Sequence, residues 1–451
     1  MTTDGSPPAD APPGADGSHA PDGSPSADGP LTGIKVLDVS SVLSGPLATM
    51  LLADLGAEVV KVEAPHAPDF TRGTGNARGG MTAYYYNTNR GKRSLAVNGR
   101  DSRGQEILRS LADQSDVVVQ NMRPGKAAGI GLDPEECLAR NPSLIYASIS
   151  GYGSTGPASA EPVYDYVIQA VAGFVDLQRH PKTGEPDLAR HFPADKVTSH
   201  AAVEAILGAL FVRERDPQRR GQHVEVSMHE ANLAFFWPDG MMQHSIVGEP
   251  DIETIYPGDF YRVYPTTDDA IVLMPLMGPF DGICRAIDRP DLIGDPRFTP
   301  LGADNLHPFQ DLLAEVVATW STKQALRIFA AHDVPAGPVT SLAEVHNHPQ
   351  AVARESVLEH DAEVIGAVRS ARPPWRFSAT PERLNSGAPT LGFDTAEILG
   401  ELGYDDAAIN SLLAEGVIAA VSATAATTTS TATAAATASQ QGSAKPGSSH
   451  R

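Results

Sequence analysis

The residue best placed to do chemistry in this sequence is Asp195, which stands near the start of an apolar helix. An Asp there can cap the helix, because its carboxylate accepts hydrogen bonds from free backbone N–H groups and suits the positive helix end. It can also take part in catalysis, and this segment alone leaves both interpretations open. The apolar residues that follow it recur at helical spacing: Val203, Ile206, Leu207, Leu210 and Phe211.

Basic residues gather where several predicted strands end, although the chain is acidic overall. The carboxyl ends of parallel strands bind ligands in open α/β sheets, so positive groups there fit a phosphate-rich ligand. Gly129 and Gly131 would permit close approach to the backbone. For any single basic residue, the alternative interpretation is an ordinary solvated surface. The residues are Lys61, Arg72, Arg90, Lys92, Arg93, Arg123 and Lys126.

Strands and helices alternate through the first half of the chain, and this alternation must position the charged residues. The rhythm, with its continuous apolar strands, predicts a parallel sheet that is covered by helices on both faces. Past about residue 250 a short strand and three helices predict a smaller second domain. The strands are expected at 33–41, 57–65, 116–122, 144–153 and 221–228.

Composition argues against several classes of function. Lys and Arg total 34 against 55 Asp and Glu, a net charge of −21 that argues against a nucleic-acid-binding surface. Cys137 and Cys284 lack CxxC spacing and His346 and His348 lack a convincing third ligand, so no metal is expected. No P-loop, dinucleotide fingerprint or G-x-S-x-G elbow is present. Without a secretory signal or a long apolar run, we expect a cytoplasmic protein with no membrane partner.

Six ordered segments together resemble one protein family. They are "LTGIKVLDVSSVLSGPLATMLLADLGAEVVKVEAP", "NRGKRSLAV", "NMRPGKAAGIGL", "NPSLIYASISGYGSTGP", "GALFVRERDPQRRGQHVEVSM" and "RPDLIGDPRF". Over roughly residues 31–420 the chain resembles the class III CoA-transferases. That family includes formyl-CoA transferase, carnitine CoA-transferase and the α-methylacyl-CoA racemases.

The resemblance implies an α/β fold in which a Rossmann-like large domain with a parallel sheet is joined to a smaller α+β domain. It also implies a homodimer of two chains threaded together as interlocked rings. Residues 30–235 would form the CoA-binding domain, 236–350 the small domain with its linker, and 351–420 the return linker and C-terminal helices. Residues 1–29 and 421–451 lack core-forming side chains and are expected to be disordered tails.

The resemblance also implies roles for individual residues. Asp195 matches the catalytic aspartate, so it can be both cap and nucleophile, and Asp165 matches an acidic residue beside the active site. The family's frequent glutamine is Leu43 here, and a common arginine near the adenine is replaced by Ala64. The positions expected to bind coenzyme A, as the acyl-CoA substrate, are Val42, Leu43, Ser44, Val97, Asn121, Met122, Arg123, Gly129, Ile130 and Met228, with Lys61 or Arg72 compensating for the lost arginine.

The predicted function is therefore that of a class III CoA-transferase, which moves CoA from an acyl-CoA to a free carboxylic acid through an aspartyl-acyl anhydride on Asp195. The first alternative is a 2-methylacyl-CoA racemase or epimerase, although the histidine that such racemases pair with the aspartate is Tyr164 here. The second is a non-catalytic CoA-binding protein, which would tolerate loss of Asp195. The glycine-rich loop of formyl-CoA transferase is missing, so formate and oxalate are not the expected acids.

Overall fold

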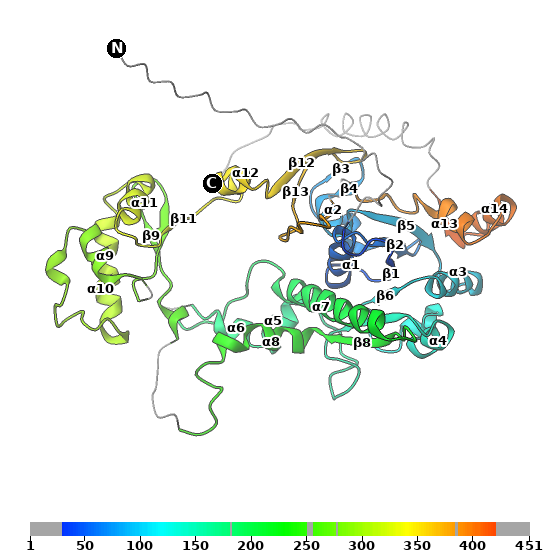
Figure 1. Ribbon diagram of the computed structural model, residues 1–451, viewed down its shortest axis with the longest axis horizontal. Helices are drawn as coiled ribbons and strands as arrows, with labels where there is room; N and C mark the ends of the chain where they lie inside the picture. Colours follow the sequence, from blue (N-terminus) through cyan, green and yellow to red (C-terminus); the bar gives the residue numbers. More distant parts are fainter. Residues whose placement is uncertain (1–28, 181–182, 250–255, 277, 384–386, 421–451) are drawn as a thin grey trace, which may run out of the picture.

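The computed structural model describes residues 29–180, 183–249, 256–276, 278–383 and 387–420 (Figure 1). Both expected tails thus lie outside the described residues, apart from Gly29. A seven-stranded sheet in the order β14-β5-β2-β1-β6-β7-β8 forms the centre of the larger part of the chain. Its strands are β1 (Lys35–Asp38), β2 (Glu58–Glu63), β5 (Lys92–Val97), β6 (Val117–Gln120), β7 (Ile145–Ser150), β8 (Gln222–Ser227) and β14 (Ile418–Ala419).

Neighbouring strands of this sheet run parallel except β14, which lies antiparallel to β5 at one edge. In β1, Leu37 pairs with Val60 of β2 on one side and with Val118 of β6 on the other. The chain adds β2 and β5 on the first side, and then crosses to add β6, β7 and β8. The predicted α/β fold with a large parallel sheet is confirmed. In doubly wound sheets of this order, ligands bind where the chain changes sides, which here is the crevice between β1 and β6.

Alternate residues of the buried strands feed two apolar cores, one on each face of the sheet. In β6, Val117 and Val119 belong to the first core and Val118 to the second. Helices α1 (Ser44–Asp54), α5 (Asp165–Val171), α6 (Phe174–Leu177), α7 (Pro193–Arg215) and α8 (Met228–Gly240) cover the first. Helices α3 (Ser102–Asp113), α4 (Pro134–Arg140), α13 (Thr395–Glu401) and α14 (Asp406–Ala414) cover the second. The end of the described chain therefore packs on the sheet that its beginning builds.

A smaller unit has its own core and lies at the opposite end of the molecule from α13 and α14 (Figure 1). Its core includes Ile283, Phe309 and Phe329, each fully buried. A three-stranded antiparallel sheet and three helices enclose it. The elements are β9 (Val263–Pro265), β10 (Ala270–Val272), β11 (Gly337–Pro338), α9 (Phe280–Ala286), α10 (Ala303–Val317) and α11 (Thr322–Ala330).

The segment that returns from the smaller unit forms a hairpin that packs beside α2. Tyr85 and Tyr86 of α2 share a small core with Ala362 and Ile365, and Tyr86 Oη lies 2.5 Å from His360 Nε2. None of the helices among the described residues is long and apolar enough to cross a membrane. The elements of this region are β3 (Ala77–Arg78), β4 (Met81–Thr82), α2 (Ala83–Asn89), α12 (Pro349–Ala353), β12 (Val357–Ala362) and β13 (Gly366–Ala371).

Candidate functional site

Asp195 lies in the first turn of α7, but it is not the cap of that helix. The helix begins at Pro193, which suits a first helical position because it has no N–H to leave unpaired. Phe192 therefore occupies the N-cap position, and it makes no side-chain capping bond. The prediction that Asp195 caps its helix is wrong. Its own backbone N–H donates instead to Asp165 Oδ2 of α5, at 3.0 Å, so that Asp165 supplies the missing cap.

The Asp195 side chain faces the start of α1. Ser44, the first residue of α1, lies near enough to the Asp195 carboxylate for its hydroxyl and backbone N–H to favour the ionised form of that group. Ser199, one turn further along α7, donates from Oγ to Ser44 O and to Asp195 O, both at 2.8 Å. Two helices that begin far apart in the sequence thus bring one carboxylate against two donors. Asp195 remains partly accessible to solvent, so a substrate can reach it.

The electrostatics of this site place the titration of Asp195 close to neutral pH. Burial, and then the nearby charge of Asp165, raise the pKa of Asp195 to about 6, against the opposing hydrogen bonds from Ser44. Tyr84 of α2 lies within electrostatic reach, and burial together with the charge of Asp195 raises the pKa of its phenol to about 12. At neutral pH the site therefore combines an ionised carboxylate with a protonated phenol.

The loop between β1 and α1 is tied to the end of β6, across the crevice where the chain changes sides. Asn121 Oδ1 accepts from Ser41 N at 2.9 Å, and Asn121 Nδ2 donates to Ser41 O at 2.7 Å. The same Nδ2 lies 3.3 Å from Ser44 Oγ. Among the residues predicted to bind CoA, the structure therefore brings Val42, Leu43, Ser44 and Asn121 together. Leu43 is buried, whereas Val42 is partly exposed.

The other residues predicted to bind CoA lie outside the β1–α1 loop, in several different places. Val97, at the end of β5, is buried in the second core, and Met122 and Ile130 pack against that core. Arg123 and Gly129 are exposed in the segment after β6. Met228 is buried in the first core, where α8 begins. Their contact with CoA stays a prediction.

Lys61 and Arg72 are engaged in buried ion pairs inside the protein. Lys61 Nζ is fully buried and lies 3.0 Å from Asp69 Oδ2, and Arg72 Nη2 lies 2.7 Å from Glu63 Oε2. Arg72 also stacks over the ring of Tyr85, at 3.8 Å from its centre. The hypothesis that either of them contacts CoA stays untested, but their surroundings favour a role in holding the loops of the site.

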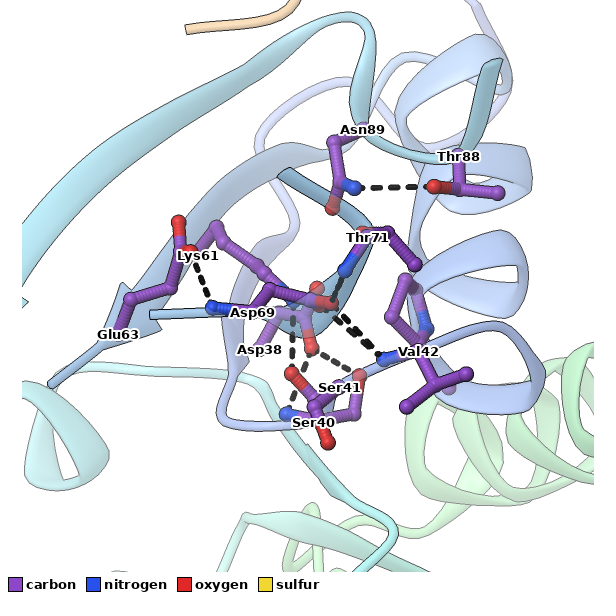
Figure 2. Close-up of polar contacts among 12 residues, drawn as sticks. Asp38, Ser40, Ser41, Val42, Lys61, Glu63, Asp69, Thr71, Thr88 and Asn89 are labelled. Atoms are coloured by element: carbon purple, nitrogen blue, oxygen red, sulfur yellow. Dashed lines mark hydrogen bonds and ion pairs between the residues drawn. The ribbon is translucent and has the colours of Figure 1, made fainter. Parts of the chain in front are cut away.

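Figure 2 shows a polar network beneath the β1–α1 loop that the sequence did not reveal. Asp38 accepts from Ser40 N at 2.9 Å and pairs with Lys92 Nζ at 2.9 Å. Burial lowers the pKa of Lys92 to about 8 against the pull of Asp38. Burial alone would raise the pKa of Asp69, but the charge of Lys61 helps to hold that pKa below its ordinary value. No spacing rule signals these pairs: Asp38 and Lys92 stand at the ends of two strands that are not neighbours in the sheet, and Asp69 lies in the loop after β2.

A pocket of about 740 Å³ is lined by residues of α6, α7 and α8 and of the segment before α7. Its α7 residues follow one helical face, and Asp195 is not among them. Phe235 of α8, which lines the pocket, leaves 62% of its surface exposed. The residues of the pocket on α7 are Pro193, Lys196, Val197, His200, Ala201 and Glu204. Among the described residues, no group of three His, Cys, Asp or Glu side chains is placed to hold a metal.

Fold and site together define an α/β protein with a helix-borne carboxylate beside the crevice of a doubly wound sheet. Residues 31–395 match the family model described as CoA-transferase family III, and the chain belongs to this family. The resemblance predicted from the sequence is confirmed.

Several relatives match along most of their length. The chain is 33% identical over 386 residues to the succinate–glutarate CoA-transferase of Agrobacterium fabrum, covering 83% of this chain and 96% of that protein. It is 33% identical over 401 residues to the human succinyl-CoA:glutarate CoA-transferase, covering 86% and 90%. Formyl-CoA:oxalate CoA-transferase of Streptomyces coelicolor is 33% identical over 415 residues, covering 86% and 99%. The crystal structure of a CAIB/BAIF family protein from Brucella suis has a TM-score of 0.71 and 31% identity, covering 83% of this chain and 100% of that one.

Proposed function

We propose that this protein transfers CoA from an acyl-CoA thioester to a free carboxylic acid, with Asp195 as the covalent nucleophile. The observation that carries the proposal is the placement of Asp195: a partly accessible carboxylate in the first turn of α7, beside Ser44 at the start of α1, to which Ser199 links it. The three relatives described above are named as CoA-transferases, which supports the reaction class.

The reaction is a series of acyl transfers. An oxygen of the Asp195 carboxylate attacks the thioester carbonyl carbon, the C–S bond breaks, and CoA leaves as a thiolate while a mixed anhydride forms. The carboxylate of the acceptor then attacks the Asp195 carbonyl carbon and releases the donor acid. Finally the thiolate attacks the carbonyl carbon of the acceptor, which gives the new thioester and restores the Asp195 carboxylate. Each step exchanges one leaving group for one nucleophile, and no oxidant or metal is needed.

The surroundings of Asp195 suit both halves of this cycle. A pKa of about 6 leaves the carboxylate mostly ionised at neutral pH, as a nucleophile must be. Ser44 donors that bind the carboxylate can turn to the oxygen that becomes negative as the carbonyl is attacked. Because Tyr84 keeps its proton, its phenol is a second donor that can orient a carboxylate acceptor.

We place CoA along the β1–β6 crevice of a Rossmann-like domain, with the thioester near Asp195. The strand order supports this position, and Arg123 and Lys126 are exposed beyond β6, where phosphates can reach them. We also propose a homodimer. Helices α7 and α8 carry the exposed aromatic side chains Phe211, Phe235 and Trp237, which a second copy can cover.

For the acceptor we propose a short dicarboxylic acid of the succinate or glutarate type. Relatives named for those acids match this chain at 33% identity over most of their length. The glycine-rich loop expected for formyl transfer is missing from the sequence, which argues against formate and oxalate.

The test is a CoA-exchange assay with purified protein, a panel of acyl-CoA donors and a panel of free acids. We expect a new acyl-CoA to form with at least one donor–acceptor pair, and no product with Asp195→Ala. Asp406→Ala, which removes an exposed carboxylate from the first turn of α14, is the matched control and should keep its activity. Transfer by Asp195→Ala above about a hundredth of the wild-type rate would contradict the covalent role, since losing a nucleophile costs more than that.

A further inference from the structure

Val42, in the loop between β1 and α1, has a backbone conformation that a valine seldom adopts. Its φ is +69°, in the left-handed region. The other non-glycine residues with positive φ among the described parts of the chain are Arg219, Asp288, Asp333 and Glu355, and none of these is β-branched. A β-branched residue is strained there, and the strain persists only where the surrounding structure holds it.

Asp69 holds Val42 in this conformation. Its Oδ2 and Oδ1 atoms accept from Val42 N at 3.1 and 3.3 Å (Figure 2). Lys61 Nζ lies 3.0 Å from the same Oδ2 and donates to Ser40 O at 2.7 Å. Lys61 therefore fixes one end of the turn directly and the other end through Asp69. Both side chains are fully buried, so water does not compete for these bonds.

The Asp69 carboxylate is itself held in place from the opposite side. Its Oδ1 accepts from Thr71 N at 3.0 Å and from Thr71 Oγ1 at 2.8 Å. Its backbone N–H donates to Glu63 Oε1 at 3.0 Å, and Glu63 is fixed by the ion pair with Arg72. A carboxylate with this many partners has one orientation, and that orientation points at the Val42 amide.

The turn at Val42 determines where Ser44 points. Two residues after Val42, Ser44 begins α1; Ser199 Oγ donates both to Ser44 O and to Asp195 O, at 2.8 Å each, so that Ser44 is tied to the segment that carries Asp195. The donor groups of Ser44 also help to lower the pKa of the Asp195 carboxyl. The turn is also tight, because a Cβ added at Gly45 would lie 2.2 Å from Ser40 Cβ. Little room is left for Ser44 to move unless the Val42 backbone changes.

We propose that Asp69, held by Lys61, is a positioning residue for the nucleophile: it keeps Val42 in the left-handed conformation so that Ser44 is aimed at Asp195. The catalytic part of this inference rests on the proposed function of Asp195. Asp69 touches neither substrate nor reacting atoms, and it acts only through the loop.

The experiment compares Asp69→Asn with Asp54→Asn in the full-length protein. Asp54 forms a buried ion pair with Arg90 (2.6 Å) at the far end of α1, so its variant also loses a buried carboxylate, but away from the loop. Two quantities are measured: amide hydrogen exchange of the peptide that contains residues 40–44, and the single-turnover rate at which acyl-CoA forms an adduct on Asp195.

Asp69→Asn should raise the exchange of the loop peptide and slow adduct formation, each by roughly tenfold, because weaker bonds to Val42 N release the loop. Asp54→Asn should leave both quantities within about twofold of wild type. Thr71→Val keeps both charges and removes one bond that orients Asp69, so it should act in the same direction by roughly threefold. It keeps the test decisive if Asp69→Asn does not fold.

The rescue variant is Val42→Gly in the Asp69→Asn background. Glycine adopts positive φ without strain, so the double variant should recover at least a part of the lost adduct rate. A double variant no faster than Asp69→Asn would overturn the proposal, as would an Asp69→Asn protein that matches Asp54→Asn in both measurements. Faster loop exchange with an unchanged adduct rate would overturn the catalytic part. A wild-type protein that forms no adduct would overturn the proposed function itself. Hydrogen exchange of the loop peptide would then still test, independently of catalysis, whether Asp69 holds the loop.

Discussion

Replacing Asp195 by Asn should make the protein more stable at neutral pH while it removes the nucleophile. In the folded protein the pKa of Asp195 is raised from 3.8 to about 6, first by burial and then by the charge of Asp165. A raised pKa means that the folded state resists ionisation of this carboxyl. The stabilisation associated with the protonated form is therefore complete below the unfolded pKa of 3.8 and is lost as the pH rises through about 6.

The size of the effect follows from the same pKa. A rise of about two pH units corresponds to ~3 kcal/mol, since each unit is worth ~1.4 kcal/mol. Because Asp195 is partly exposed, solvent screening reduces this value, and we expect a gain of ~1–2 kcal/mol for Asp195→Asn above pH 7. At about pH 3 the carboxyl of Asp195 is mostly protonated in both the folded and the unfolded state, so the gain should nearly vanish.

The assay is the difference in thermal unfolding midpoint between variant and wild type, measured from about pH 3 to pH 8. For a chain of this size a gain of 1–2 kcal/mol should appear as a rise of a few degrees. Asp239→Asn, which changes an exposed carboxylate on α8, is the control and should show no such pH-dependent gain. A variant that is less stable than wild type at neutral pH, or as strongly stabilised at about pH 3 as at neutral pH, would refute the reasoning.

Three other outcomes are expected. Turnover of the wild type should fall as the pH drops through about 6, where Asp195 becomes protonated. Asp165→Asn should move this fall to lower pH, because the charge of Asp165 helps to raise the pKa of Asp195. A fall that stays at the same pH, or moves to higher pH, would contradict this role of Asp165. Tagged and untagged homodimers mixed under native conditions should not exchange subunits, as expected for threaded rings, and rapid appearance of mixed dimers would count against interlocking. During CoA transfer in deuterium oxide, no label should enter Cα of a chiral 2-methylacyl-CoA. Racemisation needs a second base, and the position of the racemase histidine holds the exposed Tyr164 in this chain. Label that enters as fast as CoA exchanges would favour the racemase.

The sequence allowed the architecture to be predicted because the signals for it are local. Buried strands such as β6 show as continuous apolar runs, and the helix after Asp195 shows apolar residues at helical spacing. The chain's alternation of the two then indicates a parallel sheet. The start of α7 was harder, because Asp195 and Pro193 both suit a first turn. The structure puts Pro193 first, and Asp195 therefore lies too far inside the helix to cap it.

The surroundings of Asp195 could not be predicted, because they join residues that are distant in sequence. Ser199 and Ser44, which form a hydrogen bond, are 155 positions apart. Lys61 was expected to face a phosphate, since it stands in a strand at the ligand-binding edge. Its ammonium turns inward to Asp69 and Ser40 O, and nothing in the local pattern of residues distinguishes these two directions. Only the path of the loop after β2 decides between them.

The most direct test of the account is to find where the acyl group resides during transfer. The wild-type protein is incubated with an acyl-CoA that it uses, quenched with hydroxylamine and digested, and its peptides are analysed by mass spectrometry. The account predicts a hydroxamate on Asp195 in the wild type, dependent on the acyl-CoA, with none at Asp165. A protein that transfers CoA while Asp195 stays unmodified, or one that carries the modification at another residue, would contradict it.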